Sequence, residues 1–451
     1  MSNNQSITII GAGLVGSLLA LGMAKKGYQV TVYESRSDLR KSDISAGRSI
    51  NLALANRGMK ALEQQGVLDL VMPLLIEMKG RMVHIIGEQE QFQPYGIKDA
   101  DVIYSVSRGQ LNALLLDEAE KLPNVALHFE HRVKQVDLDT GIITFNSSSQ
   151  PNQRFERIIG TDGANSVLRE AIAEKTTNRE NVNVEQLGHG YKELCVMPNS
   201  SGQHKLAVNA LHIWPREDFM LIALPNLDGS FTLTLFLSKI GEQSFEALTT
   251  PAKIHDFFKQ QFPDVYPLIN NLEGDFESNP TGNLATVRCQ QWHYQDKALL
   301  LGDAAHAIVP FHGQGMNCGF EDCFDLLIQV PSSENNADWQ TIFSNTESLR
   351  KPNANAIADM ALENYIEMRS SVAKESFIRQ KAIAHQLQSW FPEQFTPRYA
   401  MVMFGAMPYS TAQELGETHK IMLAKIDEAQ QQGVTLTKDL ASQYLSTHGL
   451  L

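Results

Sequence analysis

The sequence contains few cysteines, and they are not spaced like a disulfide framework or a metal site. Four occur in 451 residues, none of them in a CxxC pair, and no secretory signal precedes them. Such thiols are typical of reduced, cytoplasmic proteins. For Cys318 and Cys323, near an expected helix start, two packed thiols are the simpler interpretation than a metal or redox pair. The four are Cys195, Cys289, Cys318 and Cys323.

Long apolar runs and an excess of positive charge are also absent. No apolar stretch reaches the ~18 residues that a membrane-spanning helix needs, so we expect a soluble, cytoplasmic protein. The 38 lysines and arginines are scattered and are outnumbered by 51 acidic residues, giving a net charge of −13. This balance disfavours a nucleic-acid partner. The chain has no internal repeat, and its length predicts two or three subdomains.

The sequence does contain a glycine-rich loop between an apolar strand and a helix near the N-terminus, Ile7-Thr-Ile-Ile-Gly-Ala-Gly-Leu-Val-Gly16. Gly11 permits a tight turn, Gly13 lets the backbone approach a pyrophosphate, and Gly16 allows close helix–strand packing. Glu34 ends a second apolar strand about 20 residues on, where an acid bonds the ribose of a dinucleotide. The pattern predicts a βαβ unit that binds FAD or NAD, and it argues against NADP as the tight ligand.

A second glycine-containing element, much later in the chain, indicates which dinucleotide is bound. The apolar run Ala298–Leu301 ends in Gly302-Asp303, and the loop Pro310-Phe-His-Gly-Gln-Gly-Met-Asn317 leads into a helix predicted from about Asn317. A carboxylate at a strand end and the free N–H groups of a helix start can hold the polar chain of a cofactor and stabilise negative charge on its ring.

The remaining sequence divides by its hydrophobic pattern. Between residues 188 and 237 the pattern is that of strands, and Phe231, Leu233, Leu235 and Leu237 alternate with other residues. This alternation predicts a sheet with one core face and one face that could overlie a ligand. Other expected elements are a strand over 81–86, a helix over 108–122, a strand pair over 125–137 and 142–145, strands over 206–214, 219–224 and 231–237, a polar linker over 331–338 and helices from there to the end.

Three motifs in order resemble the layout of the single-component FAD-dependent aromatic hydroxylases. They are the glycine loop with its acid, Ile159-Gly-Thr-Asp-Gly-Ala-Asn-Ser-Val-Leu-Arg169, and the Gly302-Asp303 element with its following loop. The chain departs from that family at Ala307, where a proline often follows the histidine. Longer strings over nearly the whole chain resemble the kynurenine 3-monooxygenases: 47–54, 79–84, 93–96, 189–194, 209–215, 311–317, 363–368 and 397–401.

The resemblance implies an activity and its partners. Members of this family hold FAD tightly and non-covalently and use NADPH as co-substrate. With O₂ they convert L-kynurenine to 3-hydroxy-L-kynurenine through a flavin C4a-hydroperoxide, a step of tryptophan degradation and NAD biosynthesis. Eukaryotic members carry a hydrophobic C-terminal anchor, whereas 424–451 is polar here and resembles the soluble bacterial form. Whether the protein is a monomer or a homodimer is left open.

The resemblance also implies which residues contact the cofactor. Asp303 would hold the ribityl chain, and the Asp162-Gly163 segment is associated with both FAD and NADPH. His312, beside the glycine loop, is the one candidate catalytic residue: it could relay a proton or only pack over the flavin ring, and we favour positioning. The full set of expected cofactor residues is Gly11, Gly13, Leu14, Val15, Gly16, Glu34, Arg36, Ala53, Arg108, Val133, Asp303, Gly315, Met316 and Asn317.

On the substrate, the resemblance places Arg81, Tyr95, Asn364 and Tyr399 at the amino-acid end. A guanidinium binds a carboxylate bidentately and a phenol adds one donor. Each of these residues has an ordinary structural alternative, such as a salt-bridged arginine or a packed aromatic, and the four matching strings together favour the substrate role. The expected apolar walls are Leu211, Met220, Ile222, Leu224, Phe236 and Met368.

The chemistry fits this set of residues. Kynurenine's aniline nitrogen activates the ring position that is hydroxylated, so no strong protein base is required, and the protein supplies orientation and exclusion of water. Two alternatives remain: a related hydroxylase of another aromatic acid, which need not keep all four polar residues, and a non-hydroxylating flavoprotein. A flavin halogenase is disfavoured because its WxWxIP string is absent.

We therefore expect an α/β protein built on a Rossmann-like FAD-binding domain with an inserted mixed sheet and a helical C-terminal region. The expected divisions are 1–187 for the first part of the FAD-binding domain with some substrate-side segments, 188–290 for the substrate sheet, 291–330 for the return to the FAD-binding domain, and 331–451 for the helical region. No metal is expected.

Overall fold

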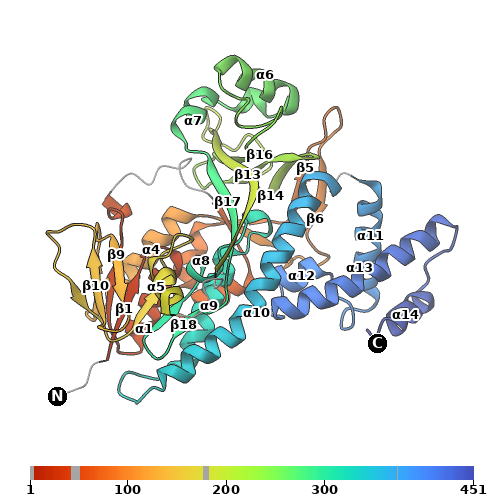
Figure 1. The fold of residues 1–451 in the computed structure, drawn as a ribbon. Helices are drawn as coiled ribbons and strands as arrows, with labels where there is room; N and C mark the ends of the chain where they lie inside the picture. Colours follow the sequence, from red (N-terminus) through yellow and green to blue (C-terminus); the bar gives the residue numbers. More distant parts are fainter. Residues whose placement is uncertain (1–4, 42–50, 176–181, 373, 451) are drawn as a thin grey trace. The chain divides into compact units, whose positions relative to one another are not determined.

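The computed structural model describes residues 5–41, 51–175, 182–372 and 374–450 (Figure 1). Residues 47–50 of the resembling string 47–54 lie outside these ranges. The chain divides into two compact units, and each takes three separate stretches of sequence. The first unit comprises 1–75, 106–187 and 284–358, and the second comprises 76–105, 188–283 and 359–451.

The first unit contains the predicted βαβ element. Its main sheet has six strands in the order β18-β19-β12-β1-β2-β8, parallel except for β18. The apolar run at Ala298–Leu301 forms a strand of this sheet, two positions from β1. The strands are β18 His293–Tyr294, β19 Ala298–Leu300, β12 Ile158–Gly160, β1 Ser6–Ile10, β2 Gln29–Tyr33 and β8 Val125–His128.

Helix α1, Leu14–Lys25, is buried on nearly all sides because it packs against both α4, Arg108–Glu120, and α9, Gly315–Gln329. Its start is shaped by glycines. At Gly11, with φ +98°, an added Cβ would lie 2.5 Å from the Thr161 carbonyl oxygen, and at Gly16 it would lie 1.9 Å from the Gly11 oxygen. Larger residues at these positions would push the loop away from its neighbours.

The expected strand over 125–137 is wrong in one respect, because it consists of two strands in different sheets. Strand β8 joins the parallel sheet beside β2, whereas β9, Val133–Asp137, pairs with β10, Ile142–Phe145, in a small antiparallel sheet completed by β11, Gln153–Arg154. Between β8 and β9 the chain turns at Glu130, a non-glycine residue with φ +59°. This turn lies in a polar segment, and the alternation of apolar and polar residues does not distinguish such a segment from a strand.

The second unit is built on a mixed sheet, as expected. Six of its strands run in the order β13-β16-β15-β14-β5-β6, antiparallel except for the β14–β5 pair. The apolar face of this sheet packs on α6, Pro251–Gln261, and α7, Leu272–Ser278, in one buried cluster. The strands are β13 Val182–Val196, β16 Phe231–Ser238, β15 Phe219–Pro225, β14 Ala210–Arg216, β5 Gly80–Val83 and β6 Gln91–Pro94.

The region after residue 338 is helical, as expected. Helix α10, Trp339–Ile366, continues into a π-helical turn over Glu367–Ser371, and α11, α13 and α14 bury a separate apolar cluster (Figure 1). Among the described residues, no helix combines the length and the apolar character needed to cross a bilayer. The C-terminal helices are α11 Glu375–Trp390, α12 Arg398–Met403, α13 Tyr409–Gln431 and α14 Lys438–Thr447.

The remaining elements are β3 Asn51–Leu54, α2 Asn56–Gln64, α3 Leu68–Val71, β4 Leu75–Met78, β7 Ile103–Ser107, α5 Val167–Lys175, β17 Gly282–Cys289 and α8 Asp303–His306.

Candidate functional site

The start of α1 is suited to binding an anion. The helix begins after Gly13, and no side chain caps its first turn, so the N–H groups of that turn remain available to a phosphate. Apart from Gly13 and its two chain neighbours, no atom of the described residues lies within 4 Å of where a Cβ at Gly13 would be. Leu14 and Val15 are the first two helical residues. The predicted pyrophosphate loop therefore has both the donors and the open approach that it needs.

Glu34 follows β2 directly, as predicted for a ribose-binding acid. Its side chain accepts hydrogen bonds from the Ala12 N–H at 2.9 Å and from the Arg36 backbone and side chain at 2.9 Å. Burial opposes ionisation of Glu34, but the bonds from Arg36 and Ala12 outweigh it and lower its pKa. Glu34 is thus held as a carboxylate beside the glycine loop, and Arg36 serves as its counter-ion.

The turn at the end of β19 carries the second predicted contact. Gly302 has φ +57°, and Asp303 then begins the short helix α8. The Asp303 side chain is exposed and makes no hydrogen bond or ion pair with another described residue. Arg108, the first residue of α4, is likewise exposed and has no such partner in the described chain. A carboxylate and a guanidinium are therefore both available to a polar cofactor.

Helix α9 begins at Gly315, two residues before the predicted start, and its first turn has no side-chain cap. The amide of Asn317 is used within the protein: its nitrogen donates to the Ala53 and Gly313 carbonyls at 2.8 and 2.9 Å, and its oxygen accepts from the Ala55 N–H. Asn317 therefore fixes β3 against the loop before α9. Met316 is buried beside it.

The other two predicted cofactor positions are also in the first unit. His312 is buried, on a 3₁₀ turn that ends at Gly313 with φ +65°. Val133 is buried at the start of β9. All the predicted cofactor residues thus lie in one unit. Two uncapped helix starts and unpaired groups at Asp303 and Arg108 fit a dinucleotide with a charged chain.

The second unit gathers the predicted amino-acid-binding residues around one guanidinium. Arg81, on β5, is 4% exposed. Its Cζ atom lies 5.2 Å from the ring centre of Tyr399 and 6.0 Å from that of Tyr95, and the two rings stack at 5.3 Å. Burial works against the charge of Arg81, but Tyr399, Glu367 and Tyr95 outweigh it and raise its pKa. The structure brings these three predicted residues together.

The carboxylate next to Arg81 was not predicted. Glu367 Oε1 lies 3.2 Å from the Arg81 guanidinium, on the π-helical turn that packs against β14 and β15. The predicted residue Met368 lies on the same turn, and Asn364 lies in the last turn of α10, with its amide nitrogen 3.3 Å from the Met368 sulfur. Near this group, burial and the charge of Arg81 lower the pKa of Lys381 to about 8.

The predicted apolar walls share one face of the sheet. Met220, Ile222 and Leu224 alternate along β15, and Met220 pairs directly with Phe236 on β16. Leu211 pairs with Arg81 across the parallel β14–β5 ladder. Because side chains alternate along a strand, these apolar residues lie on the face that carries Arg81, opposite the core packed on α6 and α7. The sheet therefore has an ionic end and an apolar stretch on one surface.

Several residues that hold these groups in place were missed. The Asn112 amide donates to the Ala12 carbonyl at 3.1 Å, and Arg169 donates to the Ala304 carbonyl at 2.9 Å, joining the second motif to the third. Asp322 accepts from the Gly302 N–H. Asn112 and Asp322 are polar residues at positions of predicted helices where apolar residues are expected, and this pattern could have marked them as buried hydrogen-bonding groups. No such pattern marks Glu367 outside the string that resembles the family.

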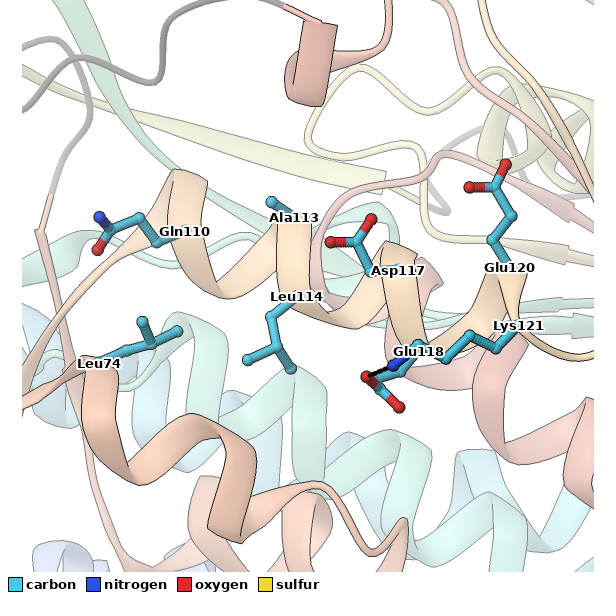
Figure 2. A pocket seen from close by; sticks show the side chains of 8 residues that line it. All are labelled: Leu74, Gln110, Ala113, Leu114, Asp117, Glu118, Glu120 and Lys121. Atoms are coloured by element: carbon cyan, nitrogen blue, oxygen red, sulfur yellow. Dashed lines mark hydrogen bonds and ion pairs between the residues drawn. The ribbon is translucent and has the colours of Figure 1, made fainter.

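Figure 2 shows a pocket along α4. Its volume is about 710 Å³, and it is lined by one edge of that helix and by Leu74, at the end of the 3₁₀ turn Met72–Leu74. Asp117 and Glu120 on that edge both pair with Arg40 at 2.8 Å. None of the predicted cofactor or substrate residues lines it. The lining is Leu74, Gln110, Ala113, Leu114, Asp117, Glu118, Glu120 and Lys121.

Comparison with known proteins identifies the family and the fold. A family model described as an FAD binding domain matches residues 4–361. A solved 2-methyl-3-hydroxypyridine-5-carboxylic acid oxygenase shares the fold with a TM-score of 0.65 at 17% identity, over 84% of this chain and 96% of that one. Proteins named kynurenine 3-monooxygenase are 46% identical in Stenotrophomonas maltophilia (93% of this chain, 92% of theirs) and 45% identical in Myxococcus xanthus (95% and 92%). The chain belongs to the kynurenine 3-monooxygenase family.

Proposed function

We propose that this protein hydroxylates L-kynurenine to 3-hydroxy-L-kynurenine, with FAD as bound cofactor and NADPH and O₂ as co-substrates. The observation that carries the proposal is the buried Arg81 beside two stacked tyrosine rings, on the same sheet face as a row of apolar side chains. Such a site suits a small molecule with a carboxylate at one end and an aromatic ring at the other.

Arg81 binds the substrate carboxylate. An amino acid that enters a dry pocket must have its carboxylate paired, because an unpaired buried charge is strongly disfavoured. The fork of a guanidinium makes two parallel hydrogen bonds to a carboxylate. Tyr95 and Tyr399 lie beside Arg81, and burial raises the pKa of both phenols. They therefore stay protonated at neutral pH and can donate.

Glu367 has a role that the sequence did not indicate. It lies 3.2 Å from Arg81, so a substrate carboxylate bound there shares the guanidinium with it. Kynurenine also carries an α-ammonium group, and a carboxylate adjacent to Arg81 is placed to accept a hydrogen bond from it. Arg81 and Glu367 together then match both charges of the amino-acid end, which favours an α-amino acid over a simple aromatic acid.

The apolar residues orient the ring and keep water out. Met220, Ile222 and Phe236 offer no competing hydrogen bond, so the aromatic end of the substrate is held by packing. FAD held by the first unit would supply the activated oxygen, with electrons from NADPH, so that one atom of O₂ would enter the ring and the other would leave as water. Since the aniline nitrogen already activates the ring, these residues need to supply orientation and dryness rather than a strong base.

NADPH oxidation by the purified yellow protein tests the proposal. We expect slow oxidation without substrate, and with L-kynurenine a large acceleration and 3-hydroxykynurenine formed in step with the NADPH consumed. Salicylate and 4-hydroxybenzoate, which lack the α-amino acid, serve as comparison substrates. Acceleration and hydroxylated product with one of these, but not with kynurenine, would indicate a hydroxylase of another aromatic acid. NADPH oxidation indifferent to every aromatic compound would reject a hydroxylase.

A further inference from the structure

A fully buried carboxylate lies behind the turn that carries Asp303. Asp322, on α9, has no exposed side-chain surface. One of its oxygens accepts from the Gly302 N–H at 2.9 Å and lies 2.6 Å from Nε2 of His306, and the other accepts from Nε of Arg350 at 2.7 Å. A carboxylate only accepts hydrogen bonds, so Nε2 of His306 carries the proton and donates. Asp322 therefore binds both ends of the short segment 302–306.

This cluster is an ion-pair network rather than a metal site. His306, Cys318 and Asp322 offer ligand atoms within 4.8 Å of one another, which is close enough for a cation. The Arg350 guanidinium fills the same region, however, with its Nη2 atom 3.5 Å from the Cys318 sulfur, and it also pairs with Asp325 at 3.1 Å. A metal ion there would face a fixed positive charge at contact distance.

We propose that Asp322 is a positioning residue for FAD, which holds the 302–306 turn and thereby sets where the Asp303 carboxylate meets the cofactor. Gly302 adopts φ +57° and ψ −142°, a conformation open to glycine and few other residues. A Cβ there would lie 3.0 Å from a Val15 methyl group. The N–H bond to Asp322 keeps the glycine in this conformation immediately before Asp303.

The turn matters because the Asp303 side chain has no described partner of its own. Its carboxylate is placed only by the backbone of the turn, and that backbone is held from two sides. Arg169 donates to the Ala304 carbonyl, and Asp322 holds Gly302 and His306. Burial alone would raise the pKa of Asp322, but His306 and Arg350 outweigh it and lower the pKa, so the carboxylate keeps both acceptor oxygens.

The test is a titration of the apoprotein with FAD, followed by flavin fluorescence, in matched variants. Asp322→Asn keeps the size of the side chain but leaves one acceptor oxygen for three donors, so either the bond from Arg350 or both bonds to the turn are lost. The charged guanidinium favours the oxygen on its own side, which leaves the amide nitrogen facing Gly302 and His306. Asp325→Asn is the control, because Asp325 pairs with the same Arg350 one turn along the same helix without a described contact to the turn. We expect the dissociation constant for FAD to rise about tenfold or more in D322N and less than about twofold in D325N.

A double-mutant cycle separates positioning from a general loss of structure. Asp303→Ala alone should weaken FAD binding about tenfold or more. If Asp322 acts through Asp303, adding D322N to D303A should weaken binding by less than about a further twofold. Wild-type FAD affinity in D322N, or effects that multiply in the double variant, would overturn the proposal.

A second variant decides the matter if D322N does not fold. His306→Phe keeps a ring against Trp292, on which the imidazole stacks at 5.0 Å, and removes the donor to Asp322. We expect weaker FAD binding in H306F that disappears in the D303A background. Unchanged FAD affinity in H306F would contradict a role for the turn. The thermal midpoint of each apoprotein is measured alongside, and it should not track the FAD affinities across the set.

Discussion

The guanidinium of Arg81 is bordered by two phenols and one carboxylate, all in the second unit. Replacement by alanine leaves a bound substrate carboxylate without its fork partner, at a cost on the order of 2–5 kcal/mol in a desolvated site. We expect Arg81→Ala to lower kynurenine affinity more than about tenfold, and to abolish the acceleration of NADPH oxidation, with normal FAD content. Equilibrium titration with kynurenine and the flavin absorbance of the purified variant measure these effects.

Two comparisons sharpen this prediction. Tyr399→Phe removes one hydroxyl and should weaken binding less than Arg81→Ala. Decarboxylated kynurenine should bind the wild type poorly and lose little more in Arg81→Ala, because both changes delete the same interaction. Release of FAD from Arg81→Ala with kynurenine affinity intact would instead make Arg81 a cofactor or structural residue.

At the level of single residues, the sequence identified side chains better than their partners. Arg81, Tyr95 and Tyr399 come from distant parts of the chain, and resemblance alone suggested that they meet; the structure brings them together. Glu367 was missed because an acid on a predicted helix is normally a solvated one, and Asp322 was missed although it falls at an apolar position of its helix. Only tertiary packing reveals that one faces a buried arginine and the other a backbone N–H.

The strands of the second unit show how much an alternating pattern predicts. Leu233, Leu235 and Leu237 were expected to face a core, and all three are fully buried against α6 and α7. The same alternating pattern predicted one strand where β8 and β9 are separate. The turn between them at Glu130, with φ +59°, contains no glycine and therefore has no distinctive sequence signal. Patterns of burial are therefore predictable along a strand, whereas the point at which a strand leaves one sheet for another is not.

Adjacent residues of β16 should have separable roles. Leu235 is fully buried in the core cluster, and its neighbour Phe236 lies on the opposite face, paired with Met220. We expect Leu235→Ala to lower the free energy of unfolding by about 2–5 kcal/mol, with little change in kynurenine affinity. Phe236→Leu should do the reverse, weakening kynurenine binding with a smaller loss of stability. Urea denaturation and kynurenine titration of both variants check this, and equal kynurenine affinities in Phe236→Leu and the wild type would remove Phe236 from the site.

Helix α13 carries a histidine that should make the protein sensitive to acid. His419 is 3% exposed, and its ring centre lies 4.4 Å from that of Phe395 in a tilted arrangement; neither of its ring nitrogens has a partner in the described chain. Burial lowers its pKa from 6.5 to about 4. The unfolded chain therefore binds a proton that the folded chain does not, and stability falls as the pH drops from about 6.5 towards 4, by on the order of 2–3 kcal/mol.

His419→Phe should remove this part of the pH dependence. We expect the difference between urea midpoints at pH 7.5 and pH 5 to become smaller than in the wild type, with a gain in stability at both values because an unpaired polar ring is replaced. His419→Gln is the matched control, since it cannot titrate but still buries polar atoms, and it should reduce the pH dependence without the gain. An unaltered difference in both variants would contradict the assignment.

At the scale of the molecule, FAD and kynurenine should each stabilise the folded protein, and they should do so through different residues. At a hundred times its dissociation constant, a ligand that binds only the folded protein adds about 2.7 kcal/mol to the free energy of unfolding. This applies to FAD. We expect FAD to raise the thermal midpoint of the apoprotein, and kynurenine to raise it further. In Arg81→Ala the effect of FAD should remain and that of kynurenine should vanish. Loss of both effects would mean that Arg81 supports the first unit.

Because each unit is assembled from three separate stretches of the chain, the order of synthesis has a consequence for how the protein is made. Strands β1 and β2 leave the ribosome early, but β19 and α9 follow only after the whole of 188–283. Until then β12 has an open edge where β19 will pair, and such edges invite pairing with other chains. Translation that stops before residue 298 therefore releases no finished domain, and a nascent chain that pauses there is the form most exposed to aggregation.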